Sequence, residues 1–146
     1  MGFYFKSTQS IPKSGEIRLG YVNEQLNNHK YTGVRPYLVV SNNVYNNTSG
    51  CADVIPFTTK RFSSKNPVHV HYPLGEVKGL KEDSTLIIEA RTTLPHSQLS
   101  EPIGYFNSEN WKKTAAGLLY QTPQIKLAFD DGVHLTGLFN HLLVVK

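Results

Sequence analysis

The sequence contains a single cysteine, Cys51, so no disulfide can form within the chain and a cysteine-rich zinc site is excluded. No apolar run approaches the length of about 20 residues that a membrane span needs. The first residues lack the apolar core and cleavage site of a secretory signal. There is no internal repeat and no low-complexity tract. We therefore expect a cytoplasmic protein without a membrane partner and, at 146 residues, a single domain over residues 1–146.

Basic residues only slightly outnumber acidic residues. Lys and Arg number 15 against 11 Asp and Glu, for a formal net charge of +4 and a pI of about 9.2. This mildly basic balance permits a nucleic-acid partner but does not require one. The sequence also lacks a nucleotide-binding glycine-rich loop, a recognisable cysteine or serine nucleophile and a paired-carboxylate site. Enzyme classes that depend on those features are therefore without support.

What is present is a β-hairpin signal over residues 33–59. It consists of an apolar, β-branched strand, a turn cluster of Asn, Thr, Ser and Gly, and a second strand, over residues 34–41, 42–50 and 52–59. Arg35 begins the first strand and Thr58 lies near the end of the second. Because antiparallel strands run back past each other, we expect these two side chains at the same end of the hairpin, where a guanidinium and a hydroxyl can share one phosphate.

Alternation of apolar and polar residues predicts further strands over residues 15–22 and 67–72, and a last strand is expected over residues 102–106. In the first, Ile17, Leu19 and Tyr21 share one face. In the second, His69 and His71 lie opposite the apolar face, and without a third ligand nearby we expect surface or packed histidines and no metal site. Ser108 is the predicted cap of a helix to residue 121, with Trp111 as its core anchor.

The hairpin resembles the MazF/PemK family of toxin ribonucleases. The resemblance rests on Gly33-Val34-Arg35-Pro36, the Asn-rich turn and Thr58 at this spacing, and it covers residues 15–121. It implies a mainly β fold, a small SH3-like barrel of antiparallel strands with one helix near residues 108–121. Residues 1–14 and 122–146 are extensions outside it, the second predicted to add a hairpin and an apolar end.

The resemblance further implies a metal-independent, sequence-selective endoribonuclease that needs no cofactor, acts on single-stranded RNA and uses Arg35 and Thr58 as its essential residues. It implies a homodimer and an acidic antitoxin that blocks the RNA grooves. Arg35 suits stabilisation of a phosphate, because its planar fork makes paired hydrogen bonds. An arginine is a poor base, however, and the groups that move the protons stay open, with Glu24 and His29 as the nearby candidates.

Other polar residues are candidates for RNA binding. The loop of residues 60–66 follows Thr58 and reads either as a solvated connection or as a basic rim that attracts RNA. The full set of predicted substrate-binding residues is Glu24, His29, Lys30, Thr59, Lys60, Arg61, His69 and Arg91.

The resemblance also implies a central strand over residues 85–93. Its second part, residues 89–93, departs from the family pattern, which commonly reads Glu-Gln-x-Arg-Thr. Here the glutamine is replaced by Ala90, and the arginine arrives one place early as Arg91. A shift of one residue in a strand turns a side chain to the opposite face unless a bulge restores it. This departure and the tail keep a second hypothesis open, in which the chain is a non-catalytic binding protein of the same fold, such as a gyrase poison or a regulatory partner-binding protein.

Overall fold

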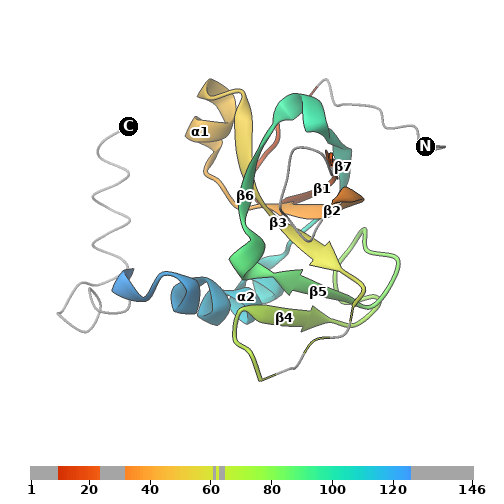
Figure 1. The fold of residues 1–146 in the computed structure, drawn as a ribbon, viewed down its shortest axis with the longest axis vertical. Coiled ribbons are helices and arrows are strands. Elements are labelled where there is room, and N and C mark those ends of the chain that lie inside the picture. Colours follow the sequence, from red (N-terminus) through yellow and green to blue (C-terminus); the bar gives the residue numbers. More distant parts are fainter. Residues whose placement is uncertain (1–9, 24–31, 61, 63–64, 126–146) are drawn as a thin grey trace.

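The computed structural model describes residues 10–23, 32–60, 62 and 65–125, and in this part of the chain antiparallel strands are the main regular structure (Figure 1). Its elements, in chain order, are β1 (Glu16–Val22), β2 (Gly33–Val39), α1 (Asn43–Thr48), β3 (Cys51–Thr58), β4 (His69–Tyr72), β5 (Ser84–Ile87), η2 (Ile88–Ala90), β6 (Thr92–Pro95), η3 (His96–Gln98), β7 (Leu99–Tyr105) and α2 (Ser108–Gln121). The predicted mainly β fold with a helix over residues 108–121 is confirmed. The hairpin predicted for the C-terminal extension lies outside the described residues.

Strand β3 is the centre of a seven-stranded sheet. Six of its strands follow the order β4-β5-β3-β2-β1-β7, and the seventh, β6, pairs with β3 outside that order. One edge of β3 pairs with β2. The other edge pairs with β6 along its first half and with β5 along its second half. The sheet thus divides at β3, and Figure 1 shows the β4–β5 pair lying below the β1–β2 pair.

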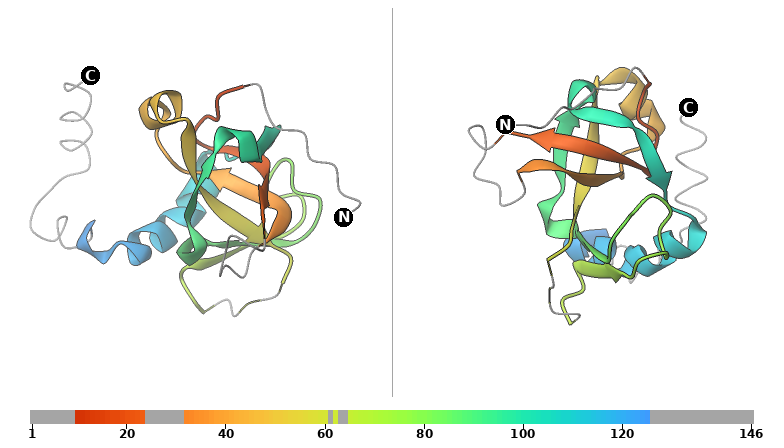
Figure 2. Two further views of the ribbon diagram at one scale, coloured as in Figure 1. Left: turned by 45° about the horizontal axis from the view of Figure 1, so that its top comes forward. Right: turned by 90° about the vertical axis from the view of Figure 1, so that its right-hand side faces the viewer.

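Alternation along β3 supplies two apolar cores, one on each face. Ile55 and Phe57 belong to the larger core, and Ala52 and Val54 belong to the smaller one. Helix α2 closes the larger core by packing on β4 and η2. In Figure 1 this helix begins behind the β4–β5 pair and extends to its left, and Figure 2 shows the same helix in two further views. Trp111 is partly buried against the core and meets the ring of Phe106 edge-on at 5.1 Å, which confirms it as the helix anchor.

The turn predicted at residues 42–50 is instead a short helix, α1. Asn42 caps it, because its Oδ1 accepts a hydrogen bond from the Tyr45 backbone N–H at 2.9 Å. Asn46 is fully buried and its side-chain amide donates to the Ser41 carbonyl at 3.1 Å. An Asn-rich segment therefore forms a capped helical turn here, because its side chains satisfy backbone groups that a tight turn would satisfy by itself.

Strand β1 is buried more completely than its alternation predicts. Arg18 lies on the face opposite Ile17, yet only 1% of it is exposed. Its guanidinium contacts the Glu16 carboxylate at 2.8 Å and donates to the Ser100 carbonyl at 3.0 Å. The same guanidinium also donates to the Ser10 and Ile11 carbonyls, which precede β1. Arg18 is therefore buried as part of an internal ion pair with further hydrogen bonds.

The predicted strand over residues 85–93 is interrupted. Strand β5 ends at Ile87, and a single 3-10 turn, η2, separates it from β6. This turn lets the chain leave the β5 edge position on β3 and return to the same edge farther along as β6. The one-residue difference from the family pattern falls in or beside this turn, so it does not shift the register of a continuous strand.

Candidate functional site

The β2–β3 register places Arg35 and Thr58 at the same end of the hairpin. The paired residues of this ladder are Tyr37 with Pro56, Leu38 with Ile55 and Val39 with Val54. If this register is extended two residues beyond the last pair, Arg35 comes opposite Thr58. Directly opposed residues of antiparallel strands point to the same face, with Cβ atoms about 5 Å apart.

Arg35 is partly buried between β1 and β3. Its nearest partner in β1 is Gly20, and its Nη2 donates a hydrogen bond to the Thr32 carbonyl at 3.2 Å. Two residues farther along β2, burial raises the pKa of Tyr37 to about 12, and the charge of Arg35 acts on that pKa in the opposite direction. The guanidinium therefore sits beside a phenol that stays protonated at neutral pH.

Thr58 is 8% exposed and lies where two clefts adjoin. Its Oγ1 accepts a hydrogen bond from the Lys60 backbone N–H at 3.3 Å, which turns the chain after β3. A cleft of about 510 Å³ runs beside it, with apolar walls that include Leu19, Pro36 and Phe57. A second cleft, of about 770 Å³, is lined by Thr59, Lys60, Phe62, His71, Leu74, Lys81, Glu82, Asp83 and Thr85. The two share Thr59, Lys81 and Glu82, so they adjoin at the end of β3, and we call the pair of clefts the hollow.

Two of the predicted substrate-binding residues, Thr59 and Lys60, line this hollow. His71 and Lys81 line it as well, although neither is among the predicted substrate-binding residues. His71 comes from β4 and Lys81 from the segment before β5, so only the strand pairing shows that they lie near Thr58. Glu24, His29, Lys30 and Arg61 lie outside the described residues.

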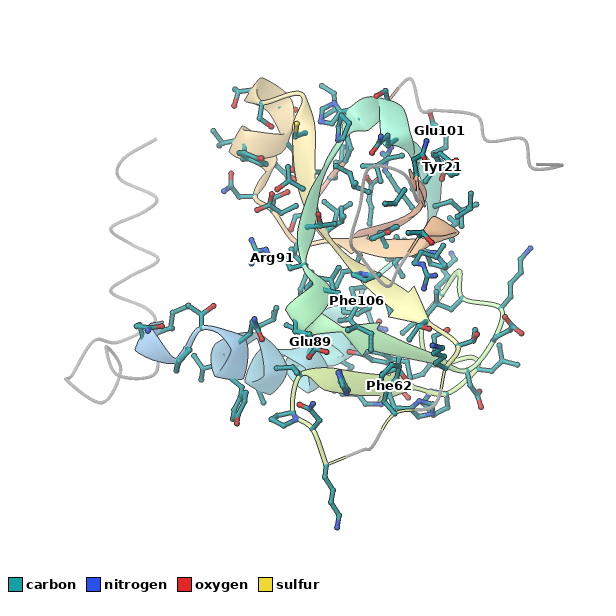
Figure 3. The ribbon with its side chains drawn as sticks, in the orientation of Figure 1. Tyr21, Phe62, Glu89, Arg91, Glu101 and Phe106 are labelled. Carbon is teal, nitrogen blue, oxygen red and sulfur yellow. The ribbon has the colours of Figure 1, made fainter. Side chains whose placement is uncertain are left out.

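His69 is held away from the hollow by its own partners. Its Nε2 lies 2.7 Å from the Glu89 carboxylate, and its ring packs against Phe62 with centroids 4.7 Å apart. Figure 3 shows Phe62 beside β4 and Glu89 at the turn before β6. Within the described ranges, no group of three or more His, Cys, Asp or Glu side chains could hold a metal ion.

Arg91 is not brought to Arg35 and Thr58. Its Nη2 contacts the Asp53 carboxylate at 3.1 Å, and Thr93 Oγ1 donates to the same carboxylate at 2.8 Å. Asp53 precedes Thr58 by five residues in β3, about 17 Å of extended chain, and an odd separation puts it on the opposite face. Figure 3 shows Arg91 beside β6, on the other side of the ribbon from Phe62. The structure therefore separates this predicted substrate-binding residue from the hollow.

Comparison with known proteins adds a family. Residues 13–121 match the model of a family described as PemK-like, MazF-like toxin of type II toxin-antitoxin system. The chain is 31% identical to endoribonuclease EndoA of Bacillus subtilis over 99 aligned residues. The aligned region covers 68% of this chain and 80% of EndoA. No helix in the described residues is long and apolar enough to cross a membrane.

Solved structures share the fold. An endoribonuclease from a mycobacterial species, in complex with its cognate antitoxin, superimposes with a TM-score of 0.62 at 20% identity, covering 77% of this chain and 95% of its own. MazF of Deinococcus radiodurans also gives 0.62, at 18% identity over 79% of this chain and 99% of its own. A third structure pairs that MazF with MazE and gives 0.61 at 19% identity, over 79% of this chain and 98% of that chain. At these identities the likeness bears on the fold, which is the architecture predicted from the sequence.

Proposed function

The chain belongs to the PemK-like, MazF-like family of type II toxins, and from this premise we propose that it is an endoribonuclease that cleaves single-stranded RNA at the end of β3. The observation that supports the proposal is the β2–β3 register, which runs Arg35 toward the end of β3 at which Thr58 lines the smaller cleft. A phosphodiester bound there meets a fixed positive charge and a hydroxyl donor at once.

The two residues divide the work of phosphate stabilisation. The Arg35 guanidinium makes charge-assisted hydrogen bonds to two phosphate oxygens, and its charge persists at every physiological pH. The Thr58 hydroxyl donates to the same phosphate. Charge that develops on the phosphorane oxygens as the 2′-oxygen attacks is then stabilised by groups already in place. The products are a 2′,3′-cyclic phosphate and a 5′-hydroxyl, and the residues named do this work without a metal ion.

The hollow explains how a single strand is held. Lys60 and Lys81 supply positive charge along the larger cleft, and Phe62 supplies an aromatic face for a base. The smaller cleft supplies apolar walls. Because base stacking depends little on sequence, sequence selectivity must come from polar groups at the rim of the hollow.

Two assemblies belong to the proposal. One is a complex with an acidic antitoxin. The mycobacterial endoribonuclease was solved with its cognate antitoxin, and the Deinococcus MazF with MazE. The net charge of +4 favours an acidic partner. The other is a homodimer. An RNA-cleaving toxin held by an antitoxin acts in the cell that makes it, which places this protein in the cytoplasm.

The test is the cleavage of a long mixed-sequence RNA in EDTA by the wild type, Arg35→Ala and Arg91→Ala. The last is a matched control, because it removes an arginine that is bound to Asp53 outside the hollow. We expect discrete fragments from the wild type and from Arg91→Ala, and intact RNA with Arg35→Ala. Fragment ends then give the recognition sequence. Intact RNA in all three lanes overturns the proposal and favours the binding-protein alternative, which a gyrase supercoiling assay tests.

A further inference from the structure

Three neighbouring strands bring Thr58, Thr85 and His71 into one row across the sheet. Thr58 of β3 pairs directly with Thr85 of β5, and Thr85 pairs directly with His71 of β4. Such pairs point to the same face of a sheet. The adjacent row, Phe57, Leu86 and Val70, lies in the larger core. The row of Thr58 therefore points away from that core. Thr85 and His71 line the larger cleft, and Thr58 lines the smaller cleft that adjoins it.

His71 is exposed, and its ring is oriented within this row. Its Nδ1 lies 3.4 Å from Thr85 Oγ1, a long hydrogen-bonding contact between neighbouring strands. Thr58 and His71 are separated by two strand spacings, about 10 Å between backbones. A phosphate held on the Thr58 hydroxyl occupies part of that gap, and the imidazole reaches back across the rest. His71 is thus the histidine of the described chain that stands in register with the proposed phosphate site.

The other titratable groups near the hollow fit proton transfer less well. Asp83 Oδ1 already accepts a hydrogen bond from the Leu74 backbone N–H at 2.7 Å. Glu82 lines both clefts from the segment before β5, and its negative charge opposes a bound phosphate. His69 contacts Glu89. A histidine is also the side chain most often used for general acid–base catalysis.

We propose that His71 is a proton-transfer residue in the RNA cleavage, an inference that rests on the function proposed above. When the 2′-oxygen bonds to phosphorus and the bond from phosphorus to the 5′-oxygen breaks, the 2′-hydroxyl loses one proton and the 5′-oxygen gains one. A neutral His71 accepts the first proton, or a protonated His71 donates the second. Exchange with water then restores the starting state.

Several charged groups share the environment of His71 and must be considered in any pH profile. Those that line the cleft with it are Lys60, Lys81, Glu82 and Asp83. On its own strand, His69 is the nearest titratable residue on the same face, and the adjacent Tyr72 is buried on the opposite face. The first experiment therefore measures kcat and KM from pH 5 to 9 for the wild type, His71→Gln, Glu82→Gln and His96→Gln. His96 is a matched control, because its Nε2 bonds the Cys51 carbonyl at the opposite end of β3 from Thr58.

We expect His71→Gln to lower kcat by about 10²–10⁴-fold with little change in KM, and to remove one limb of the pH profile. His96→Gln and Glu82→Gln keep both limbs. A substrate with sulfur in place of the bridging 5′-oxygen then assigns the role, because a thiolate leaves without protonation. Restored cleavage by His71→Gln identifies a general acid, and unrestored cleavage identifies a general base. Since His71 is exposed, the variant should fold, and His71→Asn provides a second variant that can keep a contact with Thr85.

Two results overturn the inference while leaving the proposed function intact. One is wild-type kcat in both His71 variants. The other is a raised KM with kcat and both limbs unchanged, which would make His71 a binding residue only. A wild-type protein that leaves the RNA intact overturns the proposed function, and the inference with it. Loss of the limb in Glu82→Gln instead of His71→Gln transfers the role to the carboxylate.

Discussion

Gly20 of β1 lies directly against the ring of Tyr37 of β2, and a Cβ at Gly20 would come within 2.6 Å of Tyr37 Cδ2. Tyr37 is 1% exposed, so its ring has no free space into which to move. Gly20 is also the β1 partner of Arg35. Because Gly20 has no side chain, the Tyr37 ring can pack against β1. The same close approach holds β2, which carries the proposed phosphate-binding Arg35, beside β1.

We expect Gly20→Ala to lower the free energy of unfolding by about 1–3 kcal/mol, the usual cost of overpacking a core. Urea unfolding of Gly20→Ala, Tyr37→Leu and the double variant measures it. Because the strain arises between the added methyl and the ring, the double variant should lose less than the sum of the two single losses. Additive losses would show that the ring is not what resists the methyl group.

The Thr58 hydroxyl is tested by isosteric replacement. Thr58→Val keeps the β-branched shape that suits a strand and removes the donor, whereas Thr58→Ser keeps the donor. We expect Thr58→Val to lower kcat for RNA cleavage by about 10²–10³-fold, the usual effect of losing one transition-state donor. Thr58→Ser should stay within about tenfold of the wild type. Equal activity of Val and Thr at this position would remove Thr58 from the proposed site.

The hairpin carrying Arg35 and Thr58 could be predicted from the sequence because its evidence is local. Apolar β-branched runs on either side of a polar cluster specify two antiparallel strands, and the pairing then follows from chain direction. The nature of the connection could not be predicted, because Asn-rich segments suit both turns and capped helices. The structure chooses α1, where Asn46 is buried and bonded to Ser41.

The sequence could not predict which residues from distant parts of the chain lie beside the candidate site. His71 and Lys81 reach the hollow only through the pairing of β3 with β5 and β5 with β4, which no local pattern specifies. For Arg91, the family likeness and the structure indicate different neighbours. Its family likeness suggested RNA binding, but η2 and the β3–β6 register place it beside Asp53. Residue type and spacing are therefore the basis of the chemistry proposed at Arg35 and Thr58, whereas strand order decides which other side chains lie near Thr58.

The start of α2 gives a direct contrast between sequence expectation and structure. Ser108 was predicted as the cap, but the cap is Asn107, whose Oδ1 accepts from the Asn110 N–H at 2.8 Å. Asn110 Oδ1 in turn accepts from the Asn107 N–H at 3.0 Å, which completes a capping box. We expect Asn107→Ala to lower the free energy of unfolding by about 1 kcal/mol and Ser108→Ala to leave it nearly unchanged. Chemical denaturation measures both, and a larger loss for Ser108→Ala would contradict the cap assignment.

Alkaline pH should unfold the protein through its buried tyrosines. Burial is the main cause that raises the pKa of Tyr72 to about 12, and Tyr37 is raised to about the same value. In the unfolded chain both phenols titrate near 10. Below pH 10 neither state has lost these protons, so they add no pH dependence. Between pH 10 and 12 the unfolded chain releases them while the folded protein keeps them, and the free energy of unfolding falls by up to about 2.7 kcal/mol per tyrosine.

Tyr72→Phe separates the two contributions. The Tyr72 hydroxyl donates to the Asn110 carbonyl at 2.9 Å and contacts Thr114 Oγ1, so its loss should cost about 1 kcal/mol at neutral pH. The variant can no longer lose a phenol proton at this position, and so about half of the alkaline decrease should disappear. Urea unfolding from pH 7 to 11.5 measures the difference between wild type and variant, in which the titration of the lysines cancels. Tyr120→Phe, at a position that is 64% exposed, is the control and should retain the full decrease. A wild-type slope retained in Tyr72→Phe would mean that Tyr72 titrates normally in the folded protein.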